Sequence, residues 1–297
     1  MSSIDPKSIA TRNLHQILVS TVAPRPIALV STMSDEGIPN LAPYSFFNVF
    51  SSNPPTLIFS SNLRIKDDTS KDTLHNVQSS REVVINAVTR KIARQVALAS
   101  VEYAADVNEF EKAGLTPLAS EVVKPFRVAE SPAQFECKVK KIMPLGDAGG
   151  AGNLVICEVV RLHLHDDIYD EKGKIDPLRL DLVGRMGRTY YCHAGEENIF
   201  SIYQPFDQLG IGFDQLPASI RESRVFSGHD LASLAAQTGI PSREEAMEAL
   251  NMPEVSSLIK EKKISEEALH TLAKKLLKEK REREAFAVAM LYIYELI

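Results

Sequence analysis

The residues best suited to chemistry lie between Arg25 and Thr73, where small hydroxyl and amide side chains stand at the ends of β-rich runs. These runs read PRPIALVST and NLAPYSFFNVFSSNPPTLIFSSN, and a KDT triplet follows them. Lys71 and Thr73 stand at a predicted helix start, where unpaired backbone N–H groups and the helix dipole attract anions. The combination favours a flat, polar-edged cofactor that carries a phosphate. Ordinary strand ends and turns remain an alternative, because Ser and Asn are common turn residues.

A second basic segment, LVGRMGRTYYCHAG at 182–195, places Arg185 and Arg188 among glycines and ahead of two tyrosines. The guanidinium group is a flat, permanently charged fork that suits phosphates and planar rings. A turn followed by an amphipathic aromatic strand explains the segment equally well. Its residues alone leave both interpretations open.

Other features that can carry chemistry favour a structural interpretation here. His163 and His165 would share one face of a strand and could bind a divalent ion, but no third ligand is evident from the spacing, so a strand end is favoured and no metal is expected. The signatures GxGxxG and GxxxxGKS/T are absent. The glycines of GDAGGAG (146–152) favour a flexible hairpin loop. Cys137 and Cys157, in strand-like runs, are expected to be buried, inert thiols.

The elements that must position these residues are mainly β-strands. Apolar, β-branched or alternating runs predict strands at 26–32, 40–47, 56–61, 82–88, 134–143 and 153–165. Short helices are predicted at 71–80, 91–100 and 108–114. Because few parallel crossover units separate the strands, the pattern favours an antiparallel sheet or barrel over a doubly wound fold.

From about Ser201 the pattern becomes helical, which predicts a first domain at 1–200 and a helical C-terminal extension at 201–297. One helix is expected to end at Gly239, and one long helix is expected to follow an N-cap at Ser265. The alternating charges of KEKREREA favour a solvated face. The apolar terminus AFAVAMLYIYELI is expected to pack on the barrel or on a partner subunit.

Composition and charge exclude several classes of protein. A net charge of -5 and a pI near 5.9 give no electrostatic case for nucleic-acid binding. The sequence contains no stretch of 18 or more apolar residues, so no membrane span is expected. The N-terminal residues also lack the apolar core of a secretion signal. The expected location is therefore the cytoplasm.

Several short motifs in the sequence, taken together, indicate a resemblance to a known family. The chain resembles the flavin reductase-like, FMN-binding split-barrel family, in the branch that includes flavoredoxin. The matching words are RPIALVST, NLAPYSFFN, NPPTLIFSS, KDT-x-x-N, VVINAV, NEFEKAGLTP, ESPAQFEC and GNLVICEVV, in order and at agreeing spacing over residues 20–195. The resemblance implies a mainly β, antiparallel split barrel with helical insertions.

The resemblance also implies the residues that bind FMN. Ser45, Phe46 and Asn48 would contact the isoalloxazine ring. Ser60, Ser61 and Asn62 would approach the ribityl chain and the phosphate. The triplet Lys71, Asp72 and Thr73 matches the phosphate-binding KDT of the branch, and Arg185 and Arg188 match its basic, glycine-rich segment near the flavin. Many family members stop near residue 200, so the resemblance assigns no role to the extension.

The resulting functional hypothesis is an FMN-binding oxidoreductase in which NADH or NADPH gives a hydride to the flavin. Since the flavin performs the redox chemistry, no dedicated catalytic residue is expected. The alternative is an FMN-binding electron carrier, like flavoredoxin, without NAD(P)H turnover. A third hypothesis is a structural or regulatory protein that acts through its helical tail. The resemblance further implies a homodimer, and a redox partner protein is possible.

Overall fold

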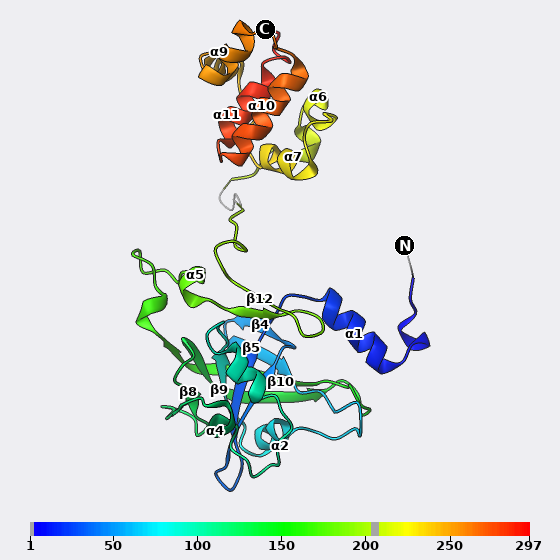
Figure 1. The fold of residues 1–297 in the computed structure, drawn as a ribbon, viewed down its shortest axis with the longest axis vertical. Helices are drawn as coiled ribbons and strands as arrows, with labels where there is room; N and C mark the ends of the chain where they lie inside the picture. The colour runs from blue at the N-terminus through cyan, green and yellow to red at the C-terminus, as the bar shows by residue number, and fades with distance from the viewer. Residues whose placement is uncertain (1–2, 203–207) are drawn as a thin grey trace. The chain divides into compact units, whose positions relative to one another are not determined.

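The computed structural model describes residues 3–202 and 208–297 (Figure 1). The chain divides into two compact units, Met1–Phe200 and Ser201–Ile297. The first unit holds all the strands of the described chain, and the second consists of helices and their connections.

A seven-stranded antiparallel sheet forms the body of the first unit, in the order β3-β2-β6-β9-β10-β5-β4. Its apolar side chains enclose a core that includes Val30, Phe59, Ile85 and Val155, all 0 or 1% exposed. The predicted strands are confirmed, with shifts at their ends, but the strand at Phe47–Ser52 lies almost wholly outside the predicted ranges. The strands are β2 (Ala28–Met33), β3 (Pro39–Tyr44), β4 (Phe47–Ser52), β5 (Pro55–Ser60), β6 (Glu82–Ala87), β9 (Ala133–Pro144) and β10 (Asn153–Leu164).

Two small sheets complete the β structure. One has the order β1-β11-β12 and is formed by β1 (Arg25–Pro26), β11 (Val183–Arg185) and β12 (Tyr191–His193). The other pairs β7 (Pro117–Leu118) with β8 (Arg127–Val128).

Short helices lie between the strands, as the sequence predicts. Asn108 caps α4 by accepting from the N–H of Phe110, and Gly114 ends it in the left-handed conformation at φ 62°. The helices of this unit are α1 (Thr11–Thr21), α2 (Asp72–Ser79), α3 (Ala93–Leu98), α4 (Glu109–Ala113) and α5 (Pro177–Leu180), with 3-10 turns at Pro6–Ser8 and Asp166–Ile168.

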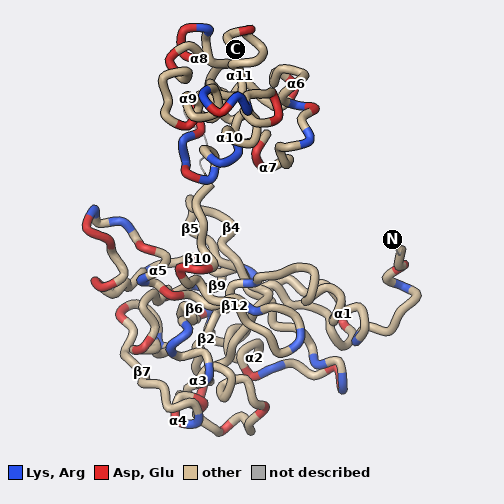
Figure 2. Tube along the Cα trace, turned by 45° about the horizontal axis from the view of Figure 1, so that its top comes forward, with Lys and Arg blue, Asp and Glu red and all other residues tan. Residues whose placement is uncertain are grey.

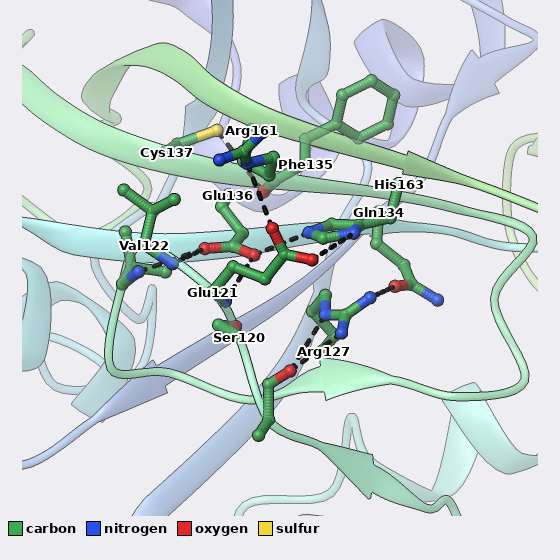
Figure 3. Close-up of polar contacts among 12 residues, drawn as sticks. Ser120, Glu121, Val122, Arg127, Gln134, Phe135, Glu136, Cys137, Arg161 and His163 are labelled. Atoms are coloured by element: carbon green, nitrogen blue, oxygen red, sulfur yellow. Dashed lines mark hydrogen bonds and ion pairs between the residues drawn. The ribbon is translucent and has the colours of Figure 1, made fainter.

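A buried carboxylate ties a long connection to the sheet. Glu136 of β9 is 0% exposed and accepts hydrogen bonds from the backbone N–H groups of Glu121, Val122 and Val123 at 2.9, 2.6 and 3.1 Å. His163 Nε2 lies 2.6 Å from Glu136 Oε1 (Figure 3). Burial alone raises the pKa of Glu136, but these hydrogen bonds outweigh burial and hold the pKa below its ordinary value. His163 is thus engaged in a structural contact, as the strand-end interpretation favoured.

The second unit has its own apolar core. Ser227 and Ser242 cap α7 and α8 with reciprocal capping boxes, which define where each helix begins. The helices are α6 (Ala218–Arg221), α7 (Gly228–Ala235), α8 (Arg243–Ala249), α9 (Pro253–Lys260), α10 (Glu266–Lys278) and α11 (Glu282–Met290), after a 3-10 turn at Phe213–Gln215. The described part of this unit also shows Lys and Arg interspersed with Asp and Glu (Figure 2). Ion pairs such as Arg281–Glu284 agree with the predicted solvated face.

Three expectations for this unit are wrong. The single long helix after Ser265 is two helices, because Lys280 adopts φ 60° and the chain reverses before α11. The helix expected to end at Gly239 ends at Ala235. The apolar terminus was expected on the barrel or on a partner subunit, but residues 285–291 are buried in the core of their own unit, where the other amphipathic helices present apolar faces.

Within the described residues, no helix combines the length and the apolar character that crossing a membrane requires.

Candidate functional site

A cavity of about 550 Å³ opens in the first unit, within the size range of small-molecule sites. It brings together seven of the residues that the sequence selects, contributed by separate elements. These residues are Ser45, Phe46, Ser60, Asn62, Lys71, Arg185 and Arg188.

The turn between β3 and β4 supplies an aromatic wall. The ring of Phe46 lies 6.0 Å from the ring of His15 in α1, and the guanidinium of Arg25 lies 6.0 Å from the same Phe46 ring. Arg25 Nε donates to Ser45 Oγ at 3.4 Å. This wall offers a flat apolar face beside polar groups, which suits a planar, polar-edged ring.

The end of β5 supplies polar side chains that are already organised. Ser60 Oγ donates to Asn62 Oδ1 at 2.8 Å, and Asn62 Nδ2 donates to the carbonyl of Gly150 at 3.1 Å. A Cβ on Gly152 would lie 2.6 Å from Ser60 Oγ, so this close approach requires glycine. The 146–152 loop, expected as a flexible hairpin connection, is thereby fastened to the cavity, and its Gly150 lines the wall.

Lys71 has no ion-pair partner among the described residues. Its ammonium lies 5.4 Å from the ring centre of Tyr44, and no carboxylate lies within ion-pair distance of it in the described parts of the chain. Burial and, next, the charge of Arg64 lower the pKa of Lys71, and the more weakly acting Glu102 carboxylate only partly opposes them. Arg64 itself pairs with Glu102 at 2.9 Å. A partly desolvated cation that faces a cavity is suited to an anionic ligand.

Four of the selected residues do not line this cavity. Asn48, on β4, is exposed and lines a second, separate cavity. Ser61 is fully buried. Thr73 is also buried, and its Oγ1 accepts from Asn40 Nδ2 at 2.9 Å. Asp72 and Thr73 line a small adjoining hollow that Lys71 also lines.

Sequence reasoning missed Arg25 as a cavity residue. Arg25 is only 8% exposed, and its Nη1 donates to the carbonyls of Val19 and Val22 at 2.5 and 2.7 Å, at the end of α1. Its Nη2 donates to the carbonyl of Met186 at 3.2 Å. The position of Arg25 at the start of the first β-rich run could have suggested it as a binding residue. Its hydrogen bonds to the end of α1 cannot be predicted from sequence spacing. Other cavity residues outside the selected set include His15, Gln16, Arg64 and Lys66.

The second cavity is larger and mainly apolar. It has a volume of about 870 Å³, and its lining includes Phe47, Val49, Phe135 and Leu162. The predicted inert thiols do not reach either cavity: Cys137 and Cys157 are buried, and burial raises the pKa of Cys137 to about 12.

Comparison with protein families gives one match, to the family described as flavin reductase like domain, over residues 20–182. An uncharacterised protein of Aquifex aeolicus is 39% identical over 181 residues, which are 61% of this chain and 90% of that protein. The family match lies within the first unit, and each match covers more than half of the chain.

Solved structures agree with this match. Nitrilotriacetate monooxygenase component B from Bacillus cereus is 30% identical with a TM-score of 0.63, and the alignment covers 68% of this chain and 98% of that one. Flavoredoxin of Desulfovibrio vulgaris (Miyazaki F) is 20% identical with a TM-score of 0.52, covering 70% and 98% of the two chains, which shows a shared fold. The predicted antiparallel split barrel with a helical C-terminal region is thereby confirmed.

Proposed function

The chain belongs to the flavin reductase-like family, and from this premise we propose that it is an FMN-binding oxidoreductase that accepts hydride from NADH or NADPH. FMN, when bound, supplies the hydride and electron chemistry. The residues of the chain bind and orient it and shield it from water. The observation that carries the proposal is Lys71, a cation that faces a cavity of suitable size without a carboxylate partner in the described residues.

We propose a division of roles around the cavity. Lys71 would bind the phosphate, because a charge-assisted contact to an anion offsets the desolvation of its ammonium. Ser60 and Asn62, held by each other and by Gly150, would bind the ribityl chain. Ser45 and Phe46 would contact the ring. Thr73 and Ser61 are buried and do not line this cavity, and we assign them a supporting role.

Anaerobic mixing tests the proposal. FMN-loaded protein is mixed with NADH or NADPH, and loss of the oxidised flavin absorbance is followed. Bleaching by either nicotinamide on the timescale of turnover is expected. A yellow protein that neither nicotinamide bleaches would instead be an electron carrier, the alternative that the resemblance to flavoredoxin favours. A colourless protein that does not bind FMN would contradict both.

A truncation that removes residues 201–297 is expected to keep FMN binding. Every lining residue of the 550 Å³ cavity lies in the unit Met1–Phe200, and each unit has its own buried core. The measurement is the FMN affinity of the truncated chain, with circular dichroism as the test of folding. A folded truncation that has lost FMN binding would show that the extension builds part of the site.

We also propose a homodimer. The mainly apolar cavity of 870 Å³ has exposed apolar lining residues, such as Val49 at 62% and Leu162 at 48%, and such a surface is characteristic of interaction sites. Two-fold symmetry is the commonest closed arrangement. The apolar C-terminus no longer supports this proposal, because it is buried within its own unit. Light scattering at micromolar concentration is expected to give a dimer, and a monomer with FMN bound would refute it. A cytoplasmic location and a redox partner stay predictions.

A further inference from the structure

Two arginines stand side by side on one rung of the three-stranded sheet. Arg25 of β1 is the register partner of Arg185 of β11, and Arg185 is in turn the partner of Tyr191 of β12. The Arg185 guanidinium lies 4.5 Å from the centre of the Tyr191 ring. Residues directly opposite each other on paired strands project to the same face, where like charges are destabilising. This rung therefore costs stability unless something neutralises it.

No carboxylate of the described residues pairs with this rung. Within residues 3–202 and 208–297, neither Arg25, Arg185 nor Arg188 has an ion-pair partner. Their hydrogen bonds go to neutral acceptors. Arg25 donates to the carbonyls at the end of α1 and of Met186 and to the hydroxyl of Ser45, and Arg185 Nη2 donates to the carbonyl of Arg188 at 2.7 Å. Neutral acceptors satisfy the donors but leave the positive charge. Burial and the charge of Arg185 lower the pKa of Arg25, which reports the same unfavourable crowding.

Arg188 adds an independent observation. It lies in the turn between β11 and β12, is exposed, and has φ 57°, a left-handed conformation that favours Gly or Asn. A long charged side chain at such a position costs stability relative to glycine. Strained residues of this kind cluster at ligand-binding sites. Arg188 lines the cavity, so ligand binding would explain why a charged residue occupies this strained backbone position.

The cavity carries more positive charge than one FMN requires. Six cationic side chains and a single carboxylate, Glu102, line it. A phosphate monoester brings a charge of about −1.5 to −2. The cations also form two groups of neighbouring charges. The charge of Arg64 lowers the pKa of Lys71, and the charge of Arg185 lowers the pKa of Arg25. One phosphate on the Lys71 side leaves the arginine side unneutralised.

We propose that Arg185 and Arg188, beside Arg25, form a second phosphate subsite, which binds the adenosine 2′-phosphate of NADPH and makes it the preferred hydride donor. This inference rests on the proposed function. The 2′-phosphate is at the end of the dinucleotide far from the nicotinamide. With the nicotinamide at the flavin, the 2′-phosphate would lie away from the ring, and Arg188 is the exposed cation of the arginine group.

Binding of the oxidised dinucleotides tests the subsite without turnover. NADP⁺ and NAD⁺ differ only in the 2′-phosphate, and neither donates hydride. Calorimetry on the full chain, with and without FMN, is expected to show NADP⁺ binding roughly tenfold or more tightly than NAD⁺, as one charge-assisted contact predicts. Arg188→Asn removes the guanidinium while tolerating the left-handed backbone. It is expected to abolish most of this preference, and to weaken the binding of NADP⁺ far more than that of NAD⁺ or FMN.

Two further variants sharpen the test. Arg185→Gln should reduce the NADP⁺ preference in the same way. Arg90→Gln makes the same charge change at an exposed arginine of this unit that lines neither cavity, and it should change nothing. Arg25 is unsuitable, because its substitution would also release the end of α1.

The outcomes separate this inference from the proposed function. Equal affinity for NADP⁺ and NAD⁺ in the unaltered chain would overturn the subsite. So would an Arg185 or Arg188 variant that weakens FMN as much as NADP⁺, since the arginines would then bind the cofactor. If NADPH fails to reduce bound FMN while the NADP⁺ preference is present and depends on Arg188, the proposed turnover fails and the subsite stands.

Discussion

Replacing Lys71 with alanine is expected to weaken FMN binding by roughly ten- to a hundredfold, because one charge-assisted phosphate contact contributes about 1.5–3 kcal/mol. Riboflavin, which has no phosphate, should lose little affinity. The measurement is a fluorescence titration of both flavins against both proteins. Equal losses for FMN and riboflavin would show that Lys71 does not bind the phosphate.

The same substitution should not destabilise the protein without flavin. Lys71 has no side-chain hydrogen bond at the start of α2, and both burial and Arg64 disfavour its charge. A melting temperature that stays level or rises therefore separates a lost ligand contact from damage to the fold. Lys91→Ala, at an exposed lysine outside the cavity, is the matched control and should alter neither flavin affinity nor melting temperature.

Glu136→Gln is expected to lower the free energy of unfolding by about 3 kcal/mol, the scale of losing strong hydrogen bonds to a buried ion. The amide keeps the shape of the side chain, but its NH₂ group faces backbone N–H donors or His163 where the carboxylate accepted from both. Urea unfolding of the two proteins at neutral pH measures the difference. A loss below 1 kcal/mol would mean that the connection at 120–123 is held by other contacts.

The pH dependence of this effect has a definite sign. Since the pKa of Glu136 is lower in the folded protein than in the unfolded chain, its contribution is present above the ordinary glutamate pKa of about 4.3 and is lost as the pH falls through the folded value. The variant should therefore differ most from the unaltered protein near neutral pH and least in acid. Glu158→Gln is the control: its pair with Lys140 at 2.7 Å is partly exposed and should contribute less than about 1 kcal/mol.

The β framework could be predicted from sequence because its signals are local. Alternating runs and turn residues define β9 and β10, and Asn108 with Gly114 defines α4 within a few residues. The helical tail was also recognisable, but the turn at Lys280 was not. Nothing in KEKREREA breaks a helix, and the reversal is favoured only because α11 then buries its apolar face in the core of the unit.

The candidate site was predictable in part. Lys71, Asn62 and Arg185 lie in or beside recognisable sequence motifs, and the fold brings them to one cavity. Contacts between residues on different elements could not be predicted from the sequence. Examples are the hydrogen bond of Arg25 to the end of α1 and that of Asn62 to Gly150, which is 88 positions away. Likewise, Thr73 belongs to the phosphate-binding KDT motif, yet its hydroxyl accepts a hydrogen bond from Asn40 and the residue does not line the cavity.

The attachment of α1 links the site to local unfolding. Val19 is the one buried residue among the eleven of α1, so few apolar contacts hold this helix in place. Arg25 donates hydrogen bonds to carbonyls at the end of this helix. His15, Gln16 and Val19 of the same helix form part of the cavity wall. A helix held in this way opens at low energetic cost, and its amide hydrogens exchange with solvent sooner than those of the central strands. A ligand that fills the cavity must slow that exchange, so the protection of α1 serves as a built-in report of occupancy.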